Sequence, residues 1–343
     1  MACALAASLL LPSIAASSGG PGGDGIETPA SYRRAPDQTF LTFPEWFLVY
    51  SPAEYADYVQ RHTPTRFPFL RHIGQFWRGY GAVIEATRHG SFNFGYHLMI
   101  VVIGVSTTGE YLVRSVYENT VGRLTEISAG GSLTEEDRFG AGVARDYVDF
   151  IRVRPWYEYD FFGKLERLWS ETPLTGNHPL RKWERRYALT SEYLGKAIYG
   201  WLIHRAARLT YEEESEVTAV RIEGLGDRRP TLPKWKVLTP LPDGSVLATV
   251  PRYQAFTDYA LALADEGVTF REIAGNRGEI LVSVLAPPRA KADVDGARWL
   301  LTQPVITRPS RERRLYVTTV PRLSATLGAL RREACEIEHV YDY

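Results

Sequence analysis

The sequence predicts two folded domains, an internally duplicated helical domain followed by a duplicated ferredoxin-like α+β sandwich. Three observations support this class: the length of 343 residues, a motif that occurs twice, and a change near residue 217 from helical periodicity to short alternating strands. One hydrophobic core usually stops growing at roughly 250 to 300 residues, so this length favours two. The expected boundaries are 1–25 for a leader or flexible tail, 26–215 for the helical domain and 216–343 for the α+β domain.

The first 25 residues combine an apolar run with small residues and a glycine-rich spacer. This pattern is typical of an export leader or membrane anchor. No Lys or Arg precedes the apolar run, so a flexible tail is the alternative. Export places the protein in the periplasm or outside the cytoplasmic membrane, whereas a flexible tail allows a cytoplasmic protein.

Residues 39–50 are rich in aromatic and β-branched side chains and are interrupted by Pro44, which predicts an extended segment. Ser51, Pro52 and Glu54 then form a helix-start pattern, with a capping residue, a proline in the first turn and an acid three residues after the cap. A second helix is expected at about 68–89, where apolar residues recur at steps of three and four.

The repeated motif is the strongest signal in the sequence. It reads Thr, any, Glu, Tyr, Leu, any, Arg or Lys, any, any, Tyr, beginning at Thr108 and again at Thr190, with a constant offset of 82 residues. A weaker pair, FLRHIGQFW at 69–77 and FFGKLERLW at 161–169, has an offset of 92 residues. Because both pairs occur in the same order, we expect residues 65–125 and 157–212 to form two superposable helical units.

The most apolar run, LMIVVIGVS, lies just before the first motif. It is shorter than the roughly 20 residues that a membrane span needs, and its extension meets Glu110 and Arg114. The matching segment of the second copy, PLRKWERRYA, is strongly charged. The sequence therefore favours a buried core helix, with membrane insertion as the alternative.

A further helix is expected at about 135–152, where Thr134 precedes three acidic residues that suit a helix N-terminus. Beyond residue 217, two copies of a strand, hairpin, strand, helix and strand pattern share the sequence TVPR, with Pro251 and Pro321 at the strand-to-helix turns. Such a repeat predicts one antiparallel sheet with both helices on one face.

Composition excludes several classes of function. Equal numbers of basic and acidic residues, 40 each, argue against a nucleic-acid partner, which requires a basic surface. Two cysteines allow no disulfide framework or cysteine-rich metal site. We find no nucleophile elbow, phosphate loop, dinucleotide fingerprint or zinc-protease motif, so no cofactor and no metal site is predicted.

The repeated motif supplies the candidate site. On a helix, residues i, i+4 and i+7 share a face, so each copy carries a stripe of an acid, a base and a tyrosine. The candidate catalytic residues are Glu110, Glu192, Tyr111 and Tyr193, and the candidate binding residues are Arg114, Tyr117, Lys196 and Tyr199.

Three hypotheses fit these stripes. They are ordinary helix-surface ion pairs, or a surface for a protein partner, or two carboxylates converging in one pocket for acid/base chemistry. We interpret the chain as a non-enzymatic binding or assembly protein of the cell envelope, an accessory subunit of a membrane-associated complex, with a protein partner and membrane association. An enzyme using Glu110 and Glu192 is the alternative.

Overall fold

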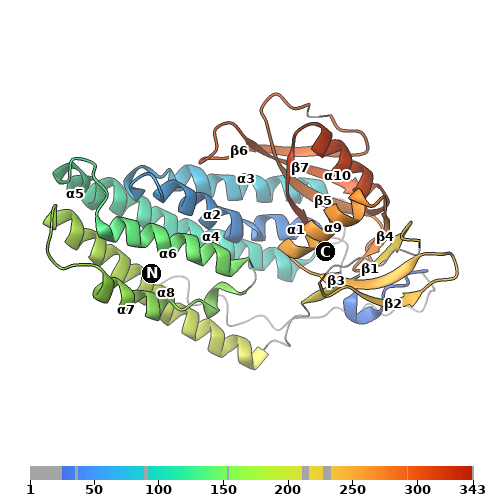
Figure 1. The fold of residues 1–343 in the computed structure, drawn as a ribbon, viewed down its shortest axis with the longest axis horizontal. Coiled ribbons are helices and arrows are strands. Elements are labelled where there is room, and N and C mark those ends of the chain that lie inside the picture. The colour runs from blue at the N-terminus through green and yellow to red at the C-terminus, as the bar shows by residue number, and fades with distance from the viewer. Residues whose placement is uncertain are drawn as a thin grey trace. The chain divides into compact units, whose positions relative to one another are not determined.

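The computed structural model describes residues 25–34, 38–88, 92–152, 154–210, 216–226, 233–291 and 293–341. The predicted leader lies almost entirely outside these residues. The chain divides into two compact units (Figure 1). The helical unit comprises the described parts of 46–77 and 97–212, and the mixed unit comprises those of 25–45, 78–96 and 213–343.

Among the described residues, eight α-helices precede the first strand. The first is α1 (Gln38–Glu45) of the mixed unit. The other seven form or enter the helical unit, and the first six of these are α2 (Phe47–Val59), α3 (Phe69–Thr87), α4 (Phe94–Tyr117), α5 (Arg123–Ser128), α6 (Glu135–Ile151) and α7 (Phe161–Glu171). The eighth is α8 (Pro179–Thr210), and single 3-10 turns, η2 (Pro64–Arg66) and η4 (Trp156–Glu158), precede α3 and α7. A π-helical segment, η3 (Glu118–Gly122), joins α4 to α5.

Local sequence explains several helix ends. Thr134 and Asp137 form a capping box at the start of α6, as the acidic run predicts. The Asp160 side chain accepts a hydrogen bond from the Gly163 N–H and so caps α7.

The predicted extended segment at 39–50 is wrong, because these residues form α1 and the beginning of α2. Pro44 lies inside α1, and Ser51, the predicted cap, lies in the interior of α2. Burial of aromatic side chains explains why this segment is helical and not extended. Phe43 and Phe47 are almost completely buried, and tertiary packing of this kind outweighs the β-propensity of aromatic residues.

The mixed unit contains two four-stranded antiparallel sheets. The first has the order β2-β3-β1-β4 and the second has the order β6-β7-β5-β8. The strands of the first sheet are β1 (Val217–Glu223), β2 (Lys236–Pro240), β3 (Val246–Pro251) and β4 (Thr269–Ile273). Those of the second are β5 (Glu279–Ala286), β6 (Arg298–Pro304), β7 (Glu312–Thr319) and β8 (Glu336–Tyr341), with helices α9 (Gln254–Asp265) and α10 (Leu323–Arg332) before the last strand of each.

The prediction of a single ferredoxin-like sheet is therefore wrong. The first strand of each half pairs on both edges with strands of its own half, β1 with β3 and β4, and β5 with β7 and β8. Pairing is thus satisfied within each half. The two sheets and both helices contribute to one hydrophobic core, which includes Val220, Phe256, Val282 and Leu327.

The shared TVPR sequence marks similar places in both halves. Pro251 is the last residue of β3, and Pro321 lies in a 3-10 turn directly after β7. Both prolines thus stand where strand pairing ends and the helix is about to begin, as expected for a residue without an N–H donor.

Helix α4 differs from its prediction as a buried core helix. Ile100 and Gly104 are buried, but Leu98, Val101 and Val105 are exposed. Gly104 permits close approach to α3, since a Cβ there would lie 2.3 Å from the Phe76 ring. One stretch of the described chain, Phe94–Ser128, has the length and composition of a membrane span, and only 22% of its apolar window is buried.

Candidate functional site

The two copies of the repeated motif meet through Arg114. Its guanidinium lies 2.5 Å from the Glu192 carboxylate of α8 and 3.8 Å from Glu110, one turn away on α4. Lys196 lies 2.6 Å from the same Glu192 carboxylate. The structure thus contains both helix pairs expected from the sequence and adds a contact between α4 and α8. We call Glu110, Arg114, Glu192 and Lys196 the motif cluster.

Aromatic rings hold the two cations of the motif cluster in matching ways. Arg114 lies 5.0 Å from the Tyr55 ring and 5.8 Å from the Phe69 ring. Lys196 lies 5.6 Å from the Tyr147 ring and 5.5 Å from the Phe161 ring. Cations over ring faces gain electrostatic attraction, and this gain increases where water is excluded.

The two glutamates differ electrostatically. Burial alone would raise the pKa of Glu192, but the charges of Arg114 and Lys196 outweigh burial and lower this pKa to about 2. The Glu110 side chain is about half exposed, at 47%. Glu192 therefore stays ionised at neutral pH, so it is poorly suited to donate or accept protons in catalysis.

The four motif tyrosines have different environments. Tyr111 and Tyr193 are buried, and the Tyr111 hydroxyl contacts the Ser51 hydroxyl. Burial raises the pKa of both hydroxyl groups. The Tyr117 hydroxyl donates to Glu184 over 2.8 Å, whereas Tyr199 stacks on Trp156 at 5.3 Å. The last tyrosine of each motif, Tyr117 or Tyr199, therefore does not join the motif cluster.

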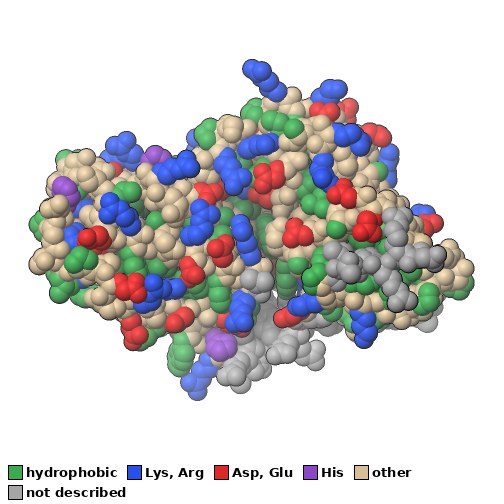
Figure 2. All heavy atoms as spheres, in the orientation of Figure 1, with side chains coloured by type: hydrophobic (Ala, Val, Ile, Leu, Met, Phe, Trp, Pro, Cys, Tyr) green, Lys and Arg blue, Asp and Glu red, His purple; other side chains and the backbone are tan. Residues whose placement is uncertain are grey.

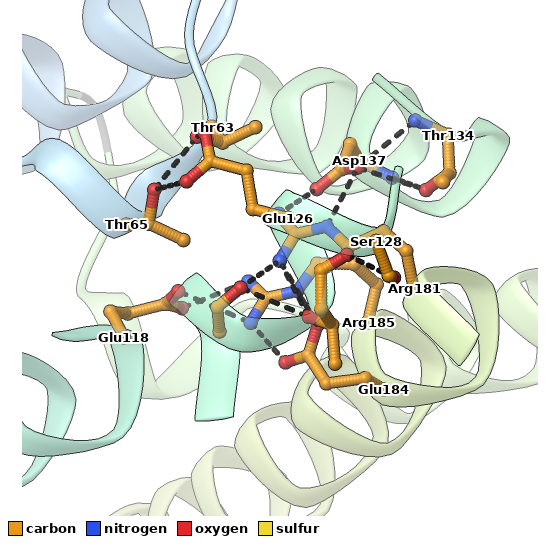
Figure 3. A network of polar contacts seen from close by, with 12 residues as sticks. Thr63, Thr65, Glu118, Glu126, Ser128, Thr134, Asp137, Arg181, Glu184 and Arg185 are labelled. Atoms are coloured by element: carbon orange, nitrogen blue, oxygen red, sulfur yellow. Dashed lines mark hydrogen bonds and ion pairs between the residues drawn. The ribbon is translucent and has the colours of Figure 1, made fainter. Parts of the chain in front are cut away.

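A second polar cluster was not predicted from the sequence. It lies around Arg181 and Arg185 at the start of α8 (Figure 3). Arg181 lies 2.9 Å from Asp137 and 3.1 Å from Glu184, and Arg185 makes a two-pronged contact with Glu118 at 2.8 and 3.2 Å. The guanidinium groups are buried, so they depend on these acids for compensation.

The same network extends along α6. Arg186 lies 2.8 Å from Glu136, and Lys182 lies 3.2 Å from the same carboxylate. Nearby, Thr63 and Thr65 donate to Glu126 over 2.7 and 2.6 Å, as Figure 3 shows. The strongly charged segment PLRKWERRYA therefore carries buried charges. The sequence did contain a signal, because its basic residues recur at positions i, i+1, i+4 and i+5 on one helix face.

The opposite faces of α4 and α8 are exposed and apolar. Each exposed apolar residue in a row along α4 has an exposed apolar counterpart 82 residues later on α8. One position in each row is small instead of large, Gly109 on α4 and Ser191 on α8. The exposed apolar residues are Leu98, Val101, Val105, Leu112 and Val116 on α4, and Leu180, Trp183, Tyr187, Leu194 and Ile198 on α8. We call these two rows the apolar stripes.

No group of three or more His, Cys, Asp or Glu side chains among the described residues has a metal-binding arrangement. Comparison of the chain with protein-family models, with curated proteins and with solved structures found no match.

Proposed function

We propose that the protein is a non-enzymatic binding or assembly protein of the cell envelope whose internally duplicated helical unit binds a lipid bilayer. The apolar stripes carry this proposal. Exposed large apolar surfaces on a folded protein mark a binding site for another apolar surface.

Internal duplication is supported by contacts that recur at fixed offsets. The Trp77 indole donates to Thr108 over 3.0 Å, and the Trp169 indole donates to Thr190 over 3.1 Å. The tryptophans are 92 residues apart and the threonines are 82 apart, as in the two sequence repeats. Two unrelated helix pairs would have no reason to share this contact.

Aromatic packing repeats in the same way at the offset of 92 residues. The Tyr55 ring lies 5.2 Å from Phe67, and Tyr147 lies 5.2 Å from Tyr159. The Phe67 ring in turn lies 4.9 Å from Phe69, and the Tyr159 ring lies 4.8 Å from Phe161. The repeated unit therefore includes α2 and α6 as well as the segments found from the sequence.

The polarity of the stripe helices is reversed relative to that of a water-soluble bundle. At the start of α8, the charged residues face inward and form ion pairs, while Leu180, Trp183 and Tyr187 face outward. Buried ion pairs beneath an apolar exterior are typical of helices that contact lipid. Exposed indoles add to this argument, because tryptophan favours the membrane interface. They are Trp77, Trp169, Trp183 and Trp201.

A bilayer surface is the occupant that fits best. Each stripe covers 19 residues of helix from first to last position, or roughly 27 Å, without a charged side chain at the stripe positions. The inner face of α4 contacts α2 through Tyr111 and Ser51, and that of α8 contacts α6 through Lys196 and Tyr147. Both stripes therefore point away from α2 and α6.

The arrangement favours a protein that lies on the membrane. Asp57 of α2 and Arg145 of α6 form an exposed ion pair at 2.8 Å. Crossing the bilayer would place this pair in hydrocarbon, which is costly for exposed charges. Figure 2 shows charged side chains spread over the visible face of the molecule. With the stripes in the interface, α2 and α6 remain in water.

Flotation of the full chain with phosphatidylcholine vesicles tests the proposal. We expect the wild-type protein to float, and Val105→Glu and Tyr187→Glu each to weaken binding by about tenfold or more, since a buried charge opposes insertion. Gly142→Glu adds the same charge at an exposed site on α6, where a Cβ meets no atom within 4 Å, and should bind normally. A wild-type protein that stays in the aqueous phase contradicts the proposal.

The enzyme alternative has one observation in its favour, the approach of Glu110 and Glu192 to the same Arg114 side chain. The lowered pKa of Glu192 counts against acid/base chemistry there. The exposed apolar stripes favour binding over catalysis.

A further inference from the structure

Three arginines line one shallow pocket beside the apolar stripe of α4. The pocket has a volume of about 450 Å³, and its basic residues are Arg66, Arg71 and Arg123. Arg66 and Arg71 are exposed and Arg123 is half-buried. Among the described residues none of the three forms a salt bridge, although the charge of Arg66 helps to lower the pKa of the nearby Glu126 carboxyl. Arg71 and Arg123 in particular can therefore contact an anionic ligand.

The remaining lining makes the pocket amphipathic. Ser115 of α4 and Asn119 of η3 supply a hydroxyl and an amide, and Leu70 supplies an apolar wall that is half exposed. Ser115 immediately precedes Val116 of the stripe, so the pocket adjoins the apolar surface. A ligand with an anionic head and an apolar tail can contact both parts at once.

The second copy of the repeat lacks most of this pocket chemistry. The positions that match Arg66 and Arg71 hold Glu158 and Gly163, and those that match Ser115 and Asn119 hold Ala197 and Trp201. Only Arg123 has a basic counterpart, Arg205. The complete set of three arginines is thus present in one copy only.

We propose that Arg66, Arg71 and Arg123 bind the phosphate group of an anionic phospholipid whose acyl chains lie against the α4 stripe. Guanidinium groups match phosphate oxygens with two-pronged hydrogen bonds. Basic pockets next to apolar helices bind lipid head groups in this way. This inference rests on the proposed membrane function and adds a lipid preference to it.

The test compares vesicles of phosphatidylcholine with vesicles in which part of it is replaced by phosphatidylglycerol. We expect the full-length wild type to bind the anionic vesicles about tenfold or more tightly, because each basic side chain near an anionic surface contributes roughly fivefold. Replacing Arg66, Arg71 and Arg123 by Gln should remove this preference and leave binding to phosphatidylcholine unchanged. The matched control replaces Arg138, Arg152 and Arg154 by Gln; these arginines are exposed elsewhere on the helical unit. This control should keep the preference for anionic vesicles.

The outcomes separate the two proposals. Equal binding of wild type to both vesicle types, or a preference that survives loss of the three pocket arginines, overturns the lipid site while membrane binding stands. Binding to neither vesicle overturns both. Inorganic phosphate serves as a competitor: if it occupies the pocket although wild type shows no preference for anionic vesicles, the ligand is free phosphate and the lipid assignment is wrong.

Discussion

Arg114 of α4 and Glu192 of α8 form an ion pair at 2.5 Å that joins the two copies of the repeated motif. Lys196 also contacts Glu192, at 2.6 Å, whereas Arg114, at 3.8 Å, is the one cation among the described residues that pairs with Glu110. Two carboxylates therefore approach one guanidinium, but they differ in exposure and in the number of cations that compensate them. This difference allows structural and catalytic roles to be distinguished.

Glu192→Gln should destabilise the protein more than Glu110→Gln. Loss of Glu192 leaves two cations without their shared partner, with an expected cost of about 1–3 kcal/mol in the free energy of unfolding. Loss of exposed Glu110 should cost no more than about 0.5 kcal/mol. Urea denaturation of both single variants and the double variant measures these values and their coupling. A larger loss of stability from Glu110→Gln than from Glu192→Gln would contradict the structural role of Glu192.

Arg185→Met should be strongly destabilising, because it leaves the buried Glu118 carboxylate without its two-pronged partner. The expected cost is about 3–5 kcal/mol. Adding Glu118→Gln should recover part of this loss, since the isolated charge is then removed. Arg152→Met provides the control, because its ion pair with Asp149 is exposed and should change stability by less than about 0.5 kcal/mol. Additive effects of Arg185→Met and Glu118→Gln in chemical denaturation would contradict the pairing.

Trp77→Phe and Trp169→Phe should have similar effects if the helical unit is duplicated. Each removes an indole hydrogen bond to the motif threonine, with an expected cost of about 0.5–1.5 kcal/mol plus lost packing. Thr108→Val should couple to the Trp77 variant and Thr190→Val to the Trp169 variant. A double-mutant cycle for each pair gives the coupling energy. Coupling in one pair alone would show that the two contacts are not equivalent.

Acid should destabilise the mixed unit through His339, whose buried side chain lies in β8. Burial lowers the pKa of His339 to about 3. The unfolded chain therefore binds a proton below about pH 6.5, while the folded chain stays neutral until about pH 3. The contribution of neutral His339 to the free energy of unfolding is therefore complete above about pH 6.5. As the pH falls from about 6.5 to about 3, this contribution decreases by up to about 1.4 kcal/mol per pH unit.

Thermal unfolding across this pH range checks the expectation with two variants. His339→Gln should reduce the pH dependence, whereas His62→Gln, at an exposed position, should leave it unchanged. An unaltered pH dependence in His339→Gln would mean that other groups cause the acid sensitivity.

The sequence by itself determined the helix-rich first part, the helices at 69–87 and 135–151, and the change to strands near residue 217. These features follow from local periodicity and capping, which act over a few neighbouring residues. It also identified Glu110, Arg114, Glu192 and Lys196 as related positions, because their spacing is repeated without a gap.

Only the tertiary structure decided which faces of these helices are buried. Residues 39–50 became helical because Phe43 and Phe47 pack inside the protein, although their propensity favours strands. The two halves of the mixed unit formed separate sheets because each first strand found both partners locally. On α8, Arg181 and Arg185 turned inward because acids from α6 and η3, distant in sequence, compensate their charges. An amphipathic pattern has two faces, and long-range partners determine which of them meets the solvent.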